Sequence, residues 1–140
     1  MKRIILILTI FLWPLDSNAV TVNVLGRKGV QLFSTSLDVK TPTHVGHISV
    51  LSFDQWKIPY EGGTYGMRKI FDLENLMEVV SDTELKAYGW CFSIDDITPE
   101  TMADQSPVID SDSVIEWYYA YAHYKNGAWI GQCVRDWQFR

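Results

Sequence analysis

The residues best suited to bind a metal are three histidines and one acidic run. His44 and His47 have a His-x-x-His spacing, but His123 is remote in the sequence and no cysteine is spare to complete a zinc site. The run DSDS at 110–113 resembles the start of a calcium loop, yet it lacks the glycine and the distal glutamate of an EF-hand. We therefore interpret the histidines as surface residues and the run as a solvated turn, and we expect no metal site.

Groups that could catalyse a reaction are also incomplete. Asp95 and Asp96 could form an acid–base pair, but adjacent residues of a strand point to opposite faces, so a turn is the better interpretation. Ser34 and Ser36 have no G-x-S-x-G elbow around them, and the glycine-rich stretch at 60–66 lacks the lysine of a phosphate loop. Catalytic triads assemble from distant residues, so the lack of a motif is weak evidence against an enzyme. A small hydrolase therefore stays as a hypothesis, but it is the least favoured one. We expect a protein without catalytic residues or a cofactor.

The aromatic run VIEWYYAYAHYKNGAWIGQCVR at 114–135 is the most informative stretch. Asn126-Gly127 between two alternating apolar runs predicts a β-hairpin, with Lys125 opposite Ala128 and Tyr124 opposite Trp129. The same register would place Ala122 opposite Gly131 and Ala120 opposite Cys133. The predicted core face carries Ile115, Trp117, Tyr119, Tyr121, Ile130 and Val134.

The other face of this hairpin has two interpretations. Ala120, Ala122 and Gly131 would form a floor of small residues, with Tyr118, Tyr124 and Trp129 standing around it. An exposed floor with aromatic walls suits a flat or partly apolar ligand, so these three aromatics are the candidate ligand-binding residues. The alternative is that a helix covers the floor as a second layer. The first interpretation predicts that the three aromatic side chains are accessible to solvent.

The two cysteines, Cys91 and Cys133, predict a disulfide if the chain is exported; two free buried thiols are the alternative. Pairing them would align the strand GWCFSID, 89–95, with the hairpin, so that Trp90, Phe92 and Ile94 join the core face.

The remaining elements are predicted from periodicity and turn residues. The stretch 20–39 alternates on both sides of GRKG, which predicts a hairpin with Gly26 and Gly29 in the turn. The stretch HISVLSF, 47–53, fits a strand or a poor helix, and YEGGTYG, 60–66, a loop. Spacing at Leu73, Leu76, Met77 and Val80 predicts a helix, with a second helical start at Ser81–Glu84 and a helical turn at Thr98. The fold class is α+β, a mostly antiparallel sheet with one or two short helices.

The N-terminal residues predict export. Lys2 and Arg3 precede an apolar run from Ile4 to Trp13, and Ser17 and Ala19 fit a signal-peptidase site. The apolar run is shorter than the ~20 residues that a membrane-spanning helix needs. We expect a signal peptide at 1–19, a single domain at 20–140, and a secreted or periplasmic protein.

The charge of the chain excludes some partners. The formal net charge is −5, which disfavours nucleic acid and anionic membrane surfaces because both require a basic footprint.

Two stretches resemble a known family. AYGWCFSID and DSDSVIEWYYAYAHYKNGAWIGQC are similar to solitary bacterial members of the transcobalamin-like C-terminal domain family, a β-grasp-type domain of unknown function. The residues that fit its pattern are Trp90, Phe92, Asp95, Asp112, Ile115, Trp117 and Tyr118. The chain departs from the pattern at Asp96 and Ser111, where the family has glycine.

The resemblance implies a β-grasp-like fold and a cobalamin or other corrinoid ligand. In transcobalamin the related domain caps cobalamin together with an α-helical barrel, which this chain lacks, so no ligand residue is carried over. The expected function is a secreted, non-enzymatic small-molecule binding domain. The alternative is a protein–protein interaction module of the cell envelope.

Overall fold

The computed structural model describes residues 18–137 of the chain, so nearly all of the expected signal peptide lies outside the described residues. Most of the described chain is β-strand, with one α-helix, which confirms the α+β class. The helix is α1, Val45–Gln55. The strands are β1 Val20–Leu25, β2 Gln31–Leu37, β3 Thr43–His44, β4 Tyr60–Gly63, β5 Gly66–Ile70, β6 Leu73–Glu74, β7 Leu76–Ser81, β8 Glu84–Ile94, β9 Pro107–Val108, β10 Val114–Lys125 and β11 Ala128–Val134.

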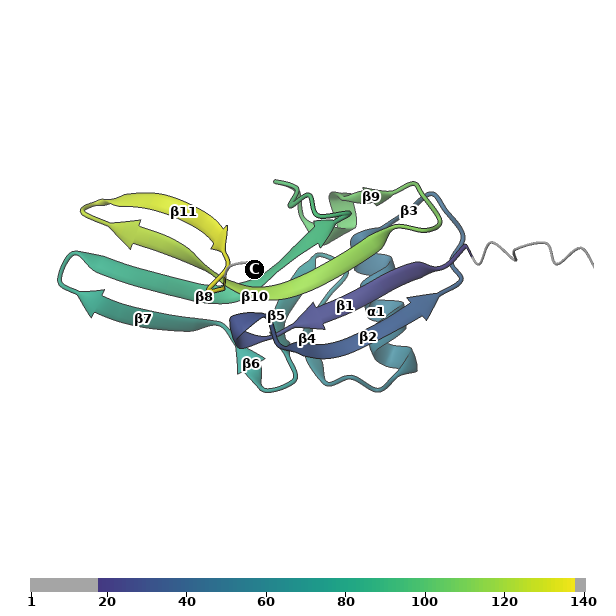
Figure 1. Cartoon of the computed structure of the whole chain (residues 1–140), viewed down its shortest axis with the longest axis horizontal. Coiled ribbons are helices and arrows are strands. Elements are labelled where there is room, and N and C mark those ends of the chain that lie inside the picture. The colour runs from purple at the N-terminus through teal and green to yellow at the C-terminus, as the bar shows by residue number, and fades with distance from the viewer. Residues whose placement is uncertain (1–17, 138–140) are drawn as a thin grey trace, which may run out of the picture.

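The main sheet has the order β2-β1-β10-β8-β7, and β11 also pairs with β10. All of these pairs are antiparallel except β1 with β10, which is parallel. β1 takes one edge of β10 up to Tyr118, and β11 takes the same edge from Tyr121 onward. The long strands β8 and β10 therefore run through two different environments, as Figure 1 shows.

The first half of β10 belongs to a hydrophobic core beneath α1. Trp117 is opposite Phe92 and Ile115 is opposite Ile94, so the predicted core face is confirmed there. The indole Nε1 of Trp117 donates a hydrogen bond of 2.8 Å to Ser49 Oγ, which joins the sheet to the helix. Ser49 Oγ donates in turn to the carbonyl oxygen of Val45, so every polar atom of this buried contact has a partner.

Helix α1 resolves the ambiguity of the 47–53 stretch. The buried residues Val45, Ile48, Ser49, Ser52 and Phe53 recur at three- and four-residue intervals. The ring of His44 caps the helix, because its Nδ1 accepts a hydrogen bond from the backbone N–H of His47. Gly46 is required here, since a Cβ at this position would collide with the carbonyl oxygen of Thr64.

The predicted helix at Leu73 to Val80 is wrong. This stretch forms β6 and β7, and all six residues of β7 are exposed. The predicted helical start at Ser81 is the turn between β7 and β8, where Ser81 Oγ accepts from the backbone N–H of Thr83. The apolar residues Leu73, Leu76, Met77 and Val80 follow one another at intervals of three, one and three positions, a spacing that also fits a helical period.

Two smaller predictions also need correction. The stretch at 60–66 is not a loop, because it contributes to the hairpin of β4 and β5. Helical structure is absent at Thr98, and a short 3-10 turn follows at Ala103–Gln105. The hairpin of β1 and β2 is confirmed, with Gly29 at φ 71° in its turn. Gly26 has φ −86° and needs no special conformation.

Candidate functional site

The second half of the sheet forms an arm that no helix of the described chain covers. The arm consists of β7, residues 84–88 of β8, residues 121–125 of β10, and β11; it projects away from the helix in Figure 1. Its strands are paired through their backbones, with the Asn126-Gly127 turn at one end. Both turn residues have positive φ, 51° and 85°, as a two-residue hairpin requires.

One face of the arm, which we call the open face, is entirely uncharged. In register across the four strands, Val79 lies opposite Leu85, Leu85 opposite Tyr124, and Tyr124 opposite Trp129. In the next row Met77, Ala87 and Ala122 are aligned in the same way. The open face consists of Met77, Val79, Leu85, Ala87, Ala122, Tyr124 and Trp129.

The opposite, charged face has a different composition. One row aligns Glu78, Lys86 and His123, and the next aligns Ser81, Glu84 and Lys125. His123 Nε2 lies 2.7 Å from Glu84 Oε1, and this hydrogen bond lowers the pKa of the Glu84 carboxyl. The sheet of the arm is thus amphipathic, with its charges on one side only.

The charged face also holds an aromatic cluster near the core. The rings of Tyr88 and Tyr119 are stacked with centroids 5.6 Å apart, and the guanidinium of Arg27 lies about 5 Å from both. Burial raises the pKa of Tyr119 and is also the main reason that the pKa of Tyr88 is raised, with a contribution from Glu78. The Arg27 cation is attracted to the faces of both rings, where the sheet passes from the arm to the core.

A hollow of about 630 Å³ adjoins the open face, since Met77, Ala87 and Ala122 are among the residues that line it. Ala87, Gly89, Ala120 and Ala122 line it from the two central strands, and we call it the alanine hollow. Gly89 lies opposite Ala120, one row beyond Ala87 and Ala122. The other lining residues are Met67, Asn75, Leu76, Met77, Tyr88, Trp90, Cys91, Tyr121, Gln132 and Cys133. The lining contains two side-chain amides and no charged group.

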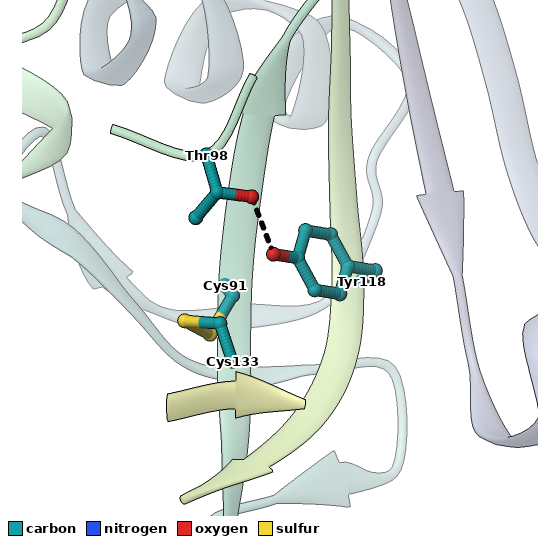
Figure 2. The surroundings of a disulfide bond; sticks show 4 residues. All are labelled: Cys91, Thr98, Tyr118 and Cys133. Atoms are coloured by element: carbon teal, nitrogen blue, oxygen red, sulfur yellow. Dashed lines mark hydrogen bonds between the residues drawn. A yellow bond between two sulfur atoms is a disulfide. The ribbon is translucent and has the colours of Figure 1, made fainter. Parts of the chain in front are cut away.

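The disulfide Cys91–Cys133 is present and forms one wall of the alanine hollow. It ties the end of β11 across β10 to β8, as Figure 2 shows. The predicted pairs Lys125 with Ala128 and Tyr124 with Trp129 are confirmed. The predicted pairs further along are wrong, because bulges place Gly131 opposite His123 and Val134 opposite Tyr121.

Tyr118 is not accessible, contrary to the expectation for a ligand platform: only 2% of its surface is exposed. The guanidinium carbon of Arg135 lies 3.8 Å from the centre of its ring. Its hydroxyl and that of Thr98 are 2.7 Å apart (Figure 2). Residues that follow β11 therefore cover this part of the sheet, which sequence periodicity could not reveal.

Tyr124 and Trp129 lie together near the end of the arm. Their rings meet edge to face with centroids 5.3 Å apart, and 54% of Trp129 is exposed. The structure therefore places two of the three candidate ligand residues on the open face and the third beneath Arg135. The floor includes Ala120 and Ala122 as predicted, whereas Ala87 and Gly89 were missed because their register with β10 depends on long-range pairing.

The residues considered for catalysis or metal binding have structural roles. Asp95 accepts hydrogen bonds from Ser113 Oγ and from the backbone N–H of Val114, so it fixes the start of β10. His44 caps α1 and has His47 beside it, with ring centroids 5.9 Å apart. Among residues 18–137 no three His, Cys, Asp or Glu side chains gather as a metal site would require. Across the same residues, no helix has the length and apolar character to cross a membrane.

Comparison with known proteins gives one structural likeness. The sequence matches no protein-family model and no curated protein. A crystal structure of a "putative metal binding protein" from Ruminococcus gnavus ATCC 29149 superposes with a TM-score of 0.47 at 19% identity. The match covers 79% of this chain and 98% of that one. At this level the likeness supports neither a family assignment nor a function.

Proposed function

We propose that this protein is a non-enzymatic binding domain that holds a small, flat, uncharged molecule in the alanine hollow. The observation that carries the proposal is the lining: two side-chain amides, no charge, and four small residues from the central strands. Ligand sites are typically ~300–1,000 Å³ in volume and mostly apolar, with a few polar groups that fix orientation. A hollow of about 630 Å³ falls inside that range.

The small residues explain why the ligand should be flat. Ala87 and Ala122 are partly exposed and carry only a methyl group, so a planar molecule can approach the backbone of the sheet there. Ala120 beside them is buried, and Asn75 Oδ1 lies over Gly89. Asn75 and Gln132 are placed to accept and donate hydrogen bonds at its edge. Tyr124 and Trp129 continue the apolar surface beyond the hollow.

The family resemblance suggests a corrinoid as the ligand. The order β2-β1-β10, with β1 parallel to β10 and α1 packed on one face, supports the β-grasp-like interpretation on which the resemblance depends. Export is supported by the disulfide, since such bonds persist in oxidising compartments. The family, the ligand and the export of the chain remain parts of this proposal.

The test is a calorimetric titration of the purified protein with cyanocobalamin and with cobinamide. We expect saturable binding that Ala122→Leu weakens at least tenfold, because Ala122 is partly exposed and a larger side chain there fills the hollow. Ala128→Leu is the control, since Ala128 is exposed near the arm turn and does not line the hollow. Absence of saturable heat with both corrinoids would rule out this ligand class.

A second candidate function is binding of a protein partner. It is favoured by the exposed apolar side chains of the arm, above all Val79 at 73% exposed. A pull-down from the envelope fraction, with Val79→Gln protein as the control, would test this function; equal recovery by both proteins would argue against it.

A further inference from the structure

We propose that the open face binds a second copy of this chain, with Trp129 of each copy inserted into the alanine hollow of the other. This inference rests on the shape and charge of the open face and does not depend on the proposed ligand.

The charge distribution favours a second copy at this face. The chain carries a net charge of −5, so two copies repel each other over most of their surface. The charges of the arm, however, lie on the other side, in rows that contain Glu78, Lys86 and His123 and then Glu84 and Lys125. Two open faces can therefore meet without bringing like charges into contact.

The shape of the open face is complementary to that of a second open face. Trp129 is 54% exposed on the open face, whereas the partly exposed Ala87 and Ala122 lie one row away, at a distance of ~7 Å along the strands. A two-fold axis between the tryptophan and the hollow would place each projection over the other copy's floor. This is the isologous arrangement, in which residue i contacts j and j contacts i.

The area of the open face limits how tightly two copies can bind. Four strands ~4.8 Å apart and about six residues long give a face of roughly 19 by 20 Å. Two such faces bury on the order of 760 Å², which is below the ~1,200 Å² at which stable interfaces begin. We therefore expect a weak, reversible dimer.

The experiment is sedimentation velocity of the purified protein over a concentration series from about 1 μM to about 1 mM. Trp129→Ala removes the projecting ring, and Val79→Gln places an amide on the open face. Glu78→Gln is the matched control, because it is the adjacent residue of β7, receives the same new side chain, and lies on the charged face. Circular dichroism confirms that each variant is folded.

We expect a monomer–dimer equilibrium in the wild type, at least a tenfold weaker dimer in Trp129→Ala and Val79→Gln, and a change within twofold in Glu78→Gln. A monomer at every concentration would overturn the inference, and the open face would then be left for a different protein. Equal weakening of the dimer by Glu78→Gln and Val79→Gln would also overturn the inference. That result would indicate that two copies pair through the backbone of the edge strand β7, not through the open face. A corrinoid in the hollow would compete with Trp129, but failure of the corrinoid titration leaves the sedimentation result intact.

Discussion

The guanidinium carbon of Arg135 lies 3.8 Å from the ring centre of Tyr118, and Arg135 Nη1 is 2.8 Å from Glu116 Oε1. Arg135 thus covers the ring of Tyr118, which strand alternation had placed on the face predicted to be accessible. The ion pair is less than one-fifth exposed, so water screens it weakly. This contact separates the buried half of the face from the alanine hollow.

Arg135→Ala should destabilise the protein because it leaves the Glu116 carboxylate partly buried and uncovers Tyr118. We expect a loss of about 1.5–3 kcal/mol in the free energy of unfolding, measured by urea denaturation. Arg68→Ala is the control, since its ion pair with Glu61 lies in solvent and its loss should be much smaller. Equal losses in the two variants would contradict the assigned role.

Removal of the disulfide should have a larger effect. The bond Cys91–Cys133 closes a loop with a sequence separation of 42, for which chain entropy predicts a stabilisation of about 4 kcal/mol. The double variant Cys91→Ser, Cys133→Ser avoids a free thiol and should unfold at a correspondingly lower urea concentration. A midpoint unchanged from that of the wild type would show that the bond does not hold the arm to the core.

The hydrogen bond between Trp117 and Ser49 should be sensitive to loss of one hydroxyl. Ser49→Ala leaves the buried indole N–H without its acceptor, which costs about 1–3 kcal/mol in the free energy of unfolding. Ser52→Ala is a matched control in the same helix, because Ser52 Oγ bonds only to the carbonyl oxygen of Ser49. A larger loss in Ser52→Ala than in Ser49→Ala would contradict the role given to Trp117.

Low pH should lower the stability of the protein, because Glu84 near the end of the arm becomes protonated. Its carboxyl has a folded-state pKa below the ordinary value of 4.5, chiefly because of the hydrogen bond with His123. This contribution to stability is present above pH 4.5 and is lost as the pH falls through the lower folded-state pKa. Glu84→Gln should therefore flatten the decline of the urea midpoint between about pH 5 and pH 3.

The Glu61 carboxyl needs a separate control, because Arg68 also lowers its pKa. Glu61→Gln removes that second contribution, so the double variant with Glu84→Gln should have the flattest profile. A wild-type decline that persists unchanged in the double variant would assign the acid sensitivity to other groups.

The sequence predicted the parts of the fold that depend on local alternation. The Asn126-Gly127 turn and the face shared by Trp117 and Phe92 follow from strand periodicity and are confirmed. The helix was harder to predict, because Ser49 and Ser52 occupy two of its buried positions and a histidine caps it. β7 was mistaken for a helix because the strand is apolar on both faces, so it lacks the alternation that marks a half-buried strand.

The candidate site could be predicted only in part. Ala120 and Ala122 were recognised as a floor of small residues, but Ala87 and Gly89 enter it through pairing between β8 and β10. The bulges near Gly131 and Cys133 shift the register of β11, and no residue pattern specifies them. Tyr118 is covered by Arg135 from the segment after β11, a long-range contact that periodicity does not encode.

The most direct test of ligand binding in the alanine hollow is a methyl NMR titration of alanine-labelled protein with cobinamide. The account predicts saturable shifts of the Ala87 and Ala122 methyl signals, because the ring system would lie against these partly exposed residues. Ala103 is the internal reference, since it is buried and does not line the hollow. Unchanged signals from Ala87 and Ala122, or equal shifts at Ala103, would contradict binding in the hollow.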